Sequence, residues 1–204
     1  QKADENLLAT SMERRGQREA ALYALTQIAK IEPAQAARLW EQHQAAFTES
    51  EQHYGWGQIG LHAARRHDPQ ALAWFARAGT SRTESQLLWK ARASLRAGNW
   101  LETYRTILSM PEALQEEPVW RYWKARSLKA MNAAFPANVL FANLSREINY
   151  YGLLAEEELP AKLEARPLDY KVTPDDLKAV ESMPAFQRAL LLRKLGDAGN
   201  AVAE

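Results

Sequence analysis

The chain has 204 residues and 47% of them are hydrophobic, so it can bury a sizeable core and is not a disordered polypeptide. Its 26 basic and 25 acidic side chains nearly cancel, which argues against a nucleic acid as the main partner, because neutralising phosphates requires an excess of lysine and arginine. Cysteine is absent, which excludes disulfides and thiolate chemistry. No stretch approaches the roughly 18 apolar residues of a membrane-spanning helix.

The start of the chain, residues 1–8, has neither the basic region nor the apolar core of a signal peptide, and we expect it to be a processed or truncated end. From there on, almost every segment has the apolar periodicity of a helix rather than the alternation of a strand. Most connections have two to six residues, which favours antiparallel neighbours. The predicted helices span residues 17–31, 33–47, 50–66, 69–78, 84–97, 99–109, 118–131, 135–146, 148–159, 174–182 and 185–196.

The ends of these helices carry the expected punctuation. Asp68 and Thr173 precede prolines and are predicted to cap helix N-termini with their side-chain oxygens. Thr83 and Gln86 have the spacing of a capping box. Three glycines stand where a helix is expected to end in a left-handed residue: Gly79, Gly98 and Gly196.

An internal repeat is the most informative feature of the chain. Trp56, Trp89 and Trp123 are 33 and 34 residues apart, and the last two each begin a Trp-Lys-Ala-Arg tetrapeptide. A period of about 34 residues is typical of helix–turn–helix arrays, in which each hairpin buries its apolar face against the next. We therefore expect the three tryptophans to fill gaps between stacked hairpins.

The two tetrapeptide copies differ just after their common part. The first has one residue more before its Ser-Leu pair, at Ser94-Leu95, than the second has before Ser127-Leu128. One residue turns a helix by about 100°, so the copies are not expected to superpose beyond this point. The predicted fold is an all-α superhelical array of short antiparallel helix pairs, a degenerate tetratricopeptide-like solenoid. We assign residues 1–163 to this array and 164–204 to a linker-like segment with further helices.

Local motifs for catalysis or metal binding are not found. The four histidines, His43, His53, His62 and His67, form no recognisable ligand set, and structural or exposed roles are expected for them. The acidic clusters at 116–117 and 156–158 look like solvated surface rather than a general acid, which needs burial or a charged neighbour. We predict no catalytic, cofactor-binding or metal-binding residue within the chain.

The aromatic residues offer a different type of site, since the chain has seven tryptophans and seven tyrosines. Amphipathic rings stack on sugars as well as filling cores, and arginines attract acidic polymers. The alternative is that the rings belong to the core and the arginines to a solvated surface. The candidate glycan-facing residues are Trp120, Arg121, Tyr122, Arg126 and Tyr150.

Residues 120–128, Trp-Arg-Tyr-Trp-Lys-Ala-Arg-Ser-Leu, resemble a helix of the soluble lytic murein transglycosylases. The Ala-x-x-Leu-Phe pattern that follows in that family matches 137–141. Its Tyr-Tyr-Gly-x-x-Ala element matches 150–155, and residues 186–195 look like its next helix. The sequence departs from the family at 132–135, where a glycine-containing turn is expected.

The resemblance implies a long α-superhelical region with a lysozyme-like domain at its C-terminal end. Such enzymes cleave the β-1,4 bond between N-acetylmuramic acid and N-acetylglucosamine without water, and one glutamate, acting first as acid and then as base, helps to close a 1,6-anhydro ring. That glutamate lies in a Glu-Ser motif followed by Gly-Leu-Met-Gln. Glu49-Ser50, Glu84-Ser85 and Glu181-Ser182 lack this continuation, so no catalytic residue is transferred and the catalytic domain is expected beyond residue 204.

The sequence therefore predicts the scaffold and glycan-positioning segment of a periplasmic lytic transglycosylase, without cofactor. Its expected partners are peptidoglycan strands, with other cell-wall enzymes as further candidates and any membrane attachment supplied by parts outside this sequence. The alternative is a tetratricopeptide-like adaptor that binds a peptide or protein in a concave groove. A metal-dependent hydrolase is a third possibility, which the spacing of the histidines does not favour.

Overall fold

The computed structural model describes residues 14–80, 83–159 and 172–203, and these residues form helices with no strand among them. The all-α prediction is confirmed. Cα packing divides the chain into two units, Gln1–Lys162 and Leu163–Glu204, each of which is considered by itself. The division at 163/164 that the sequence favours stays a prediction for the protein's domains.

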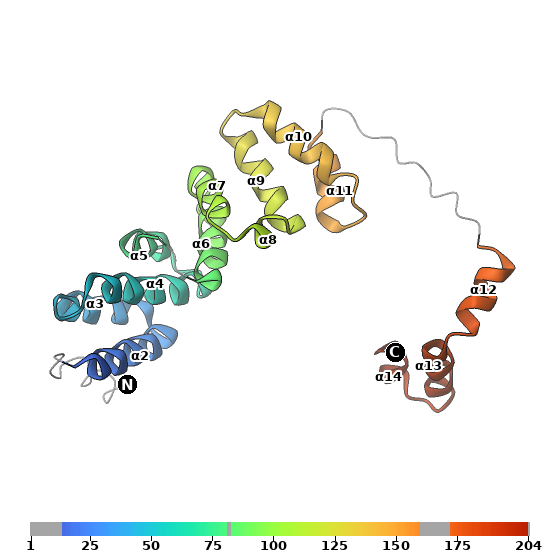
Figure 1. Ribbon diagram of the computed structural model, residues 1–204, viewed down its shortest axis with the longest axis horizontal. Helices are drawn as coiled ribbons and strands as arrows, with labels where there is room; N and C mark the ends of the chain where they lie inside the picture. The colour runs from blue at the N-terminus through green and yellow to red at the C-terminus, as the bar shows by residue number, and fades with distance from the viewer. Residues whose placement is uncertain (1–13, 81–82, 160–171, 204) are drawn as a thin grey trace. The chain divides into compact units, whose positions relative to one another are not determined.

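The first unit is a succession of helical hairpins joined by short turns (Figure 1). Helices α4 and α5, α6 and α7, and α9 and α10 form the closely packed pairs, while α2 packs on α4, α4 on α6 and α7 on α9. Its elements are α2 (Arg15–Ile31), α3 (Pro33–His43), the 3-10 turn η1 (Gln44–Ala46), α4 (Glu49–Arg65), α5 (Ala71–Ala78), α6 (Glu84–Arg96), α7 (Trp100–Leu108), α8 (Glu112–Gln115), α9 (Pro118–Ala130), α10 (Ala134–Leu144) and α11 (Tyr150–Glu157).

Three apolar clusters follow one another along this unit. The first cluster contains residues of α2, α3, α4 and α5, together with Ala93 of α6. The second contains residues of α6, α7 and α9, and the third contains residues of α9, α10 and α11. Trp123 packs against both of the last two clusters, as expected of a ring that fills the gap between neighbouring hairpins. Each hairpin thus buries its apolar face on the next, which is how repeat arrays gain their stability.

The two tetrapeptide copies stay in register to the end of their helices, which corrects the expectation that one residue separates them. Helices α6 and α9 both have 13 residues. Gly98 (φ 66°) and Asn132 (φ 64°) each lie nine positions after the tryptophan of the tetrapeptide and turn the chain in the same left-handed conformation. The Ser-Leu pair is therefore displaced by substitutions within helices of equal length and not by an inserted residue. Asn132 takes the place of the glycine expected in this turn, because asparagine tolerates positive φ better than most residues do.

Trp56 occupies a different position from the other two tryptophans. The left-handed residue after α4 is His67 (φ 63°), eleven positions beyond Trp56 rather than nine. Trp56 is only 2% exposed and its indole nitrogen donates to Gln44 Oε1 at 2.9 Å, whereas Trp89 and Trp123 are partly buried. The repeat in strict register thus covers two hairpins and not three.

The predicted helix ends agree with the structure within two residues, except that α3 gives way to η1 after His43. Thr83 Oγ1 accepts from the Gln86 amide at 3.2 Å, and Thr173 forms a capping box with Asp176. Asp68 Oδ1 accepts from the Gln70 amide at 2.8 Å, in the turn that leads to α5. The short helices α8 and α14 were not predicted; both have six residues or fewer, too few to show a period.

The second unit contains α12 (Pro174–Glu181), α13 (Pro184–Lys194) and α14 (Ala198–Ala203), with α13 packed on α14. None of the side chains described between 172 and 202 is buried. Its apolar residues, among them Leu177, Leu191 and Leu195, are exposed.

Candidate functional site

Among the regions of the first unit that combine aromatic and charged side chains, two are candidate sites. The first, here named the α9–α11 corner, comprises Arg121, Tyr122 and Arg126 of α9, the loop residues Glu147 and Asn149, and residues 150–158 in and just after α11. The second, here named the α2–α4 groove, is a hollow of about 650 Å³ between the first helix described and α4.

Tyr122 is the centre of the α9–α11 corner. Its ring contacts those of Trp123, Phe141 and Tyr151, with centroids 5.2, 5.8 and 5.7 Å away. Its hydroxyl lies 3.5 Å from Glu158 Oε1, to which it donates. Burial, together with the negative charge of Glu158, raises the pKa of Tyr122, so the hydroxyl keeps its proton and remains a donor.

Glu158 pairs with two cationic side chains of α9. Arg126 donates to its Oε1, and Lys129 Nζ lies 3.0 Å from its Oε2 and donates to its backbone oxygen at 3.0 Å. Burial opposes ionisation of this carboxyl, but the hydrogen bond from Lys129 and the charges of Arg126 and Lys129 outweigh it and lower its pKa. The carboxylate is thus a fixed anion that joins the end of α11 to α9.

The loop before α11 is fixed in the same way. Arg121 pairs with Glu147, whose other oxygen accepts from Asn149 Nδ2 at 3.0 Å. Asn149 Oδ1 in turn caps α11 by accepting from the Gly152 amide at 2.9 Å. The hydrogen bond from Arg121, against the opposing effect of burial, lowers the pKa of Glu147. Glu147 and Glu158 are therefore ionised partners of arginines and not candidates for a general acid.

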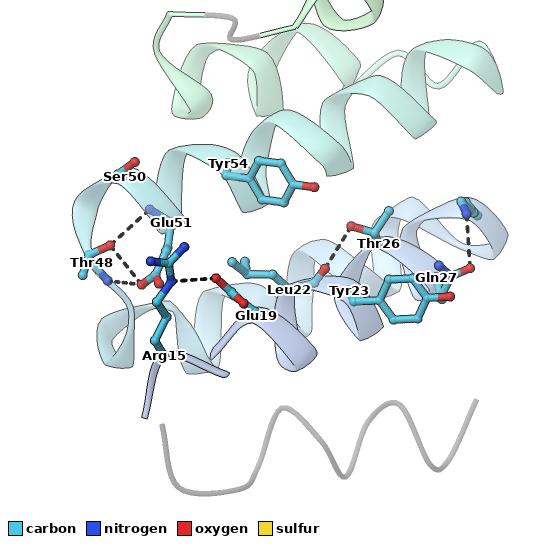
Figure 2. Close-up of a pocket in the computed structure, with 11 residues that line it drawn as sticks. Arg15, Glu19, Leu22, Tyr23, Thr26, Gln27, Thr48, Ser50, Glu51 and Tyr54 are labelled. Atoms are coloured by element: carbon cyan, nitrogen blue, oxygen red, sulfur yellow. Dashed lines mark hydrogen bonds and ion pairs between the residues drawn. The ribbon is translucent and has the colours of Figure 1, made fainter. Parts of the chain in front are cut away.

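Figure 2 shows the α2–α4 groove, with Tyr23 on α2 and Tyr54 on α4. Tyr23 is 68% exposed and Tyr54 is 36% exposed, whereas Leu22 beside them is buried. The lining also includes polar residues: Thr26, Gln27 and Lys30 from α2 and Ser50 from α4. Two aromatic faces among hydroxyls and an amide make this hollow amphipathic rather than apolar.

Ion pairs neutralise one end of the groove. Arg15 pairs with Glu19 at 2.7 Å, and Arg18 pairs with Glu51 at 3.0 Å. Burial opposes ionisation of Glu51, but hydrogen bonds from Thr48 and Arg18 outweigh it and lower its pKa. At the other end Lys30 Nζ donates to Gln27 Oε1 at 3.2 Å, and within the described residues no carboxylate pairs with it.

The comparisons with known proteins include a likeness to a solved structure. No protein-family model matches the chain, and no curated protein matches it. Among solved structures, an inactive mutant of the lytic transglycosylase Slt from Pseudomonas aeruginosa is similar, with a TM-score of 0.67 and 29% sequence identity. The likeness covers 94% of this chain. The chain is lytic transglycosylase-like.

The lytic transglycosylase-like chain spans 32% of the length of that Slt structure, about a third. The likeness confirms the family resemblance that residues 120–159 indicated, and it confirms the all-α superhelical array of helix pairs. The specific residues of the resemblance build the α9–α11 corner, where they hold three helices together.

The five candidate glycan-facing residues lie in different environments of this lytic transglycosylase-like fold. Trp120 is 1% exposed in the core between α6 and α9, and Tyr122 is also buried. Arg121 and Arg126 are engaged by Glu147 and Glu158. Tyr150 is 68% exposed and stands edge-on to Tyr151 at 5.2 Å. The corner brings four of the five together, with Tyr150 as its accessible ring, and glycan contact by these residues stays a prediction.

Sequence reasoning missed the α2–α4 groove, because its two tyrosines are 31 positions apart on different helices. A usable signal was Tyr23, an aromatic residue on the polar face of the helix predicted at 17–31. Of the histidines, His62 is buried in α4 and the others are not. Within 14–80, 83–159 and 172–203, no group of three histidines, cysteines or acidic residues is placed to hold a metal ion. Over the same residues, no helix is both long enough and apolar enough to cross a bilayer.

Proposed function

We propose that the chain is the scaffold and glycan-positioning segment of a lytic transglycosylase, which cleaves the β-1,4 bond between N-acetylmuramic acid and N-acetylglucosamine with formation of a 1,6-anhydro ring. The observation that carries the proposal is the likeness to Slt over 94% of the chain at 29% identity. The substrate is peptidoglycan, the compartment is the periplasm, and the cleavage is performed by a lysozyme-like domain outside the present sequence.

Two structural features support a scaffold role. The three apolar clusters make each hairpin depend on its neighbours, so the array behaves as a framework rather than as separate helices. In the α9–α11 corner, Glu147 and Glu158 are neutralised by arginine and lysine, whereas a glycosidase acid needs a carboxyl whose pKa is raised. The corner thus suits structural support better than bond cleavage.

The test separates binding from cleavage. The purified 204-residue chain is incubated with peptidoglycan sacculi and then centrifuged, and we expect it to sediment with them while releasing no anhydro-muropeptides. A longer protein that carries this segment and a catalytic domain should release them. Release by the 204-residue chain alone would contradict the scaffold role. A chain that stays in the supernatant would contradict glycan positioning and favour the adaptor alternative.

A further inference from the structure

We infer that the α2–α4 groove is a holding site for a peptidoglycan strand, with sugar rings on Tyr23 and Tyr54 and an anionic stem peptide near Lys30. This inference rests on the proposed function and gives it a location that differs from the α9–α11 corner. It follows from the exposure of the two tyrosines, the polarity of the groove walls and the charge at the Lys30 end.

The exposed rings of the groove are suited to sugars. A sugar ring presents an apolar face of C–H bonds and a rim of hydroxyls, so its binding sites pair aromatic faces with hydrogen-bonding groups. The groove supplies Tyr23 and Tyr54 from two helices, with the Gln27 amide beside Tyr23 and the Ser50 hydroxyl farther along the lining. Its volume of about 650 Å³ falls within the range of small-ligand sites.

The polarity of the walls disfavours a packed helix as the occupant. A helix that docks in a groove needs a continuous apolar stripe to receive its anchors. Here α2 lines the groove with Tyr23 and with several polar residues, among them Glu19, Thr26, Gln27 and Lys30. Leu22, the aliphatic residue of the lining, is already buried.

The charges give the groove a direction. Its Arg15 end is neutralised by ion pairs, whereas Lys30 carries a charge that no described carboxylate offsets. Arg66 is not part of the groove lining, but it lies close to this end, since its Nη1 donates to the Lys30 backbone oxygen at 3.4 Å. The carboxylates of a stem peptide are complementary to this end, and a neutral sugar backbone is complementary to the aromatic part.

The first experiment measures binding of the full 204-residue chain to soluble, uncross-linked peptidoglycan strands by isothermal calorimetry. Tyr23→Ala is expected to weaken binding about fivefold to tenfold, as loss of one aromatic contact does. Phe135→Ala is the matched control, since Phe135 is an aromatic residue on α10 that is 83% exposed and lies outside both regions. Circular dichroism should show unchanged helicity for both variants, because both side chains are mostly exposed.

The second experiment tests whether the stem peptide binds at the Lys30 end of the groove. Lys30→Gln should weaken binding of strands that carry stem peptides by about threefold or more, and leave unchanged the binding of neutral β-1,4-linked N-acetylglucosamine oligosaccharides, which carry neither peptide nor carboxylate. Equal binding of the peptide-bearing strands by Lys30→Gln and the wild-type chain would overturn the placement of the peptide.

Ring-labelled tyrosine NMR then identifies the surface that is used. Strand-dependent shifts at Tyr23 and Tyr54 are expected, with little change at Tyr150. Binding by the wild-type chain with shifts only at Tyr150, or with undiminished affinity of Tyr23→Ala, would overturn the groove and leave the proposed function standing. No binding by the wild-type chain would end both proposals.

Discussion

Gly152 of α11 lies directly against the backbone carbonyl of Glu147. A Cβ at residue 152 would overlap the Glu147 carbonyl oxygen and would lie 3.1 Å from the carbonyl oxygen of Leu144. Backbone atoms cannot yield as the tip of a flexible side chain can, so only glycine lets α11 approach the end of α10 this closely. The glycine of the Tyr-Tyr-Gly element therefore has a packing reason, independent of any contact with substrate.

Gly152→Ala should destabilise the chain by about 1–3 kcal/mol, the usual cost of overpacking. Gly16→Ala is the matched control, because Gly16 is also helical but nothing lies within 4 Å of a Cβ there. The control should be neutral or up to about 1 kcal/mol more stable, from the better helix propensity of alanine. Urea unfolding followed by circular dichroism measures both variants. Equal stability of Gly152→Ala and the wild type would show that α11 does not hold this position.

The turns after α4 and α6 lead to two predictions in which the change in stability has opposite signs. Gly98 (φ 66°) ends α6 and His67 (φ 63°) ends α4, both in the left-handed conformation. Gly98→Ala should cost about 1–2 kcal/mol, and His67→Gly should gain up to about 1 kcal/mol, because a Cβ strains this conformation. Changes of opposite sign in the stability measured by thermal unfolding would support a left-handed conformation at both positions. A loss of stability in His67→Gly would indicate that the imidazole makes a contact that outweighs the strain.

The fold was largely predictable because its signals are local. Periodicity, prolines at helix starts and glycines at helix ends specify the hairpins between residues 33 and 145 closely. The register of the repeat was harder to judge, since a displaced Ser-Leu pair looks like an insertion until Gly98 and Asn132 are seen to turn the chain at the same distance from their tryptophans. Trp56 led to a wrong prediction for the opposite reason. Its spacing from Trp89 matches the repeat, but its position relative to the turn that follows its helix is different.

Glu158 links α11 to α9, and Glu158→Gln should reduce stability by about 1 kcal/mol, since the carboxylate and both its cationic partners are partly exposed. The loss should shrink in high salt, which screens such pairs. Burial opposes ionisation here, but Lys129 and Arg126 prevail and keep the pKa of Glu158 below its ordinary value. The stabilisation is therefore present above the ordinary pKa of glutamate and lost as pH falls through the lowered pKa, where variant and wild type should converge.

Exposed Glu157 provides the comparison for this experiment, because Glu157→Gln removes the same charge one residue earlier. Hydrogen exchange of the α11 amides, measured beside urea unfolding, should show faster opening in Glu158→Gln than in Glu157→Gln. Equal exchange in the two variants would mean that the ion pairs with Arg126 and Lys129 do not fasten α11.

The candidate sites were less predictable than the fold, because they depend on which helix faces remain uncovered. Trp120 and Tyr122 carry rings that could stack on sugar, and only tertiary packing reveals that both are buried. Tyr23 and Tyr54 lack any shared motif and become neighbours of one groove through the packing of α2 on α4. Composition and spacing cannot encode that exposure.

His62 gives the chain a pH dependence that can be measured. It is 7% exposed in α4, and burial, assisted by the charges of Arg65 and Lys30, lowers its pKa to about 4 from an ordinary 6.5. Between pH 6.5 and 4, His62 therefore binds a proton in the unfolded chain but not in the folded chain. The free energy of unfolding should fall across this window as pH decreases, by up to about 3 kcal/mol from this residue.

His62→Gln removes this proton linkage while leaving every carboxylate in place. Urea unfolding of both proteins at several pH values from 7 to about 4 should show a wild-type curve that falls more steeply than that of the variant. The difference between the curves isolates His62, because the acidic residues titrate alike in both proteins. Parallel curves would mean that the imidazole is hydrated in solution and carries no such penalty.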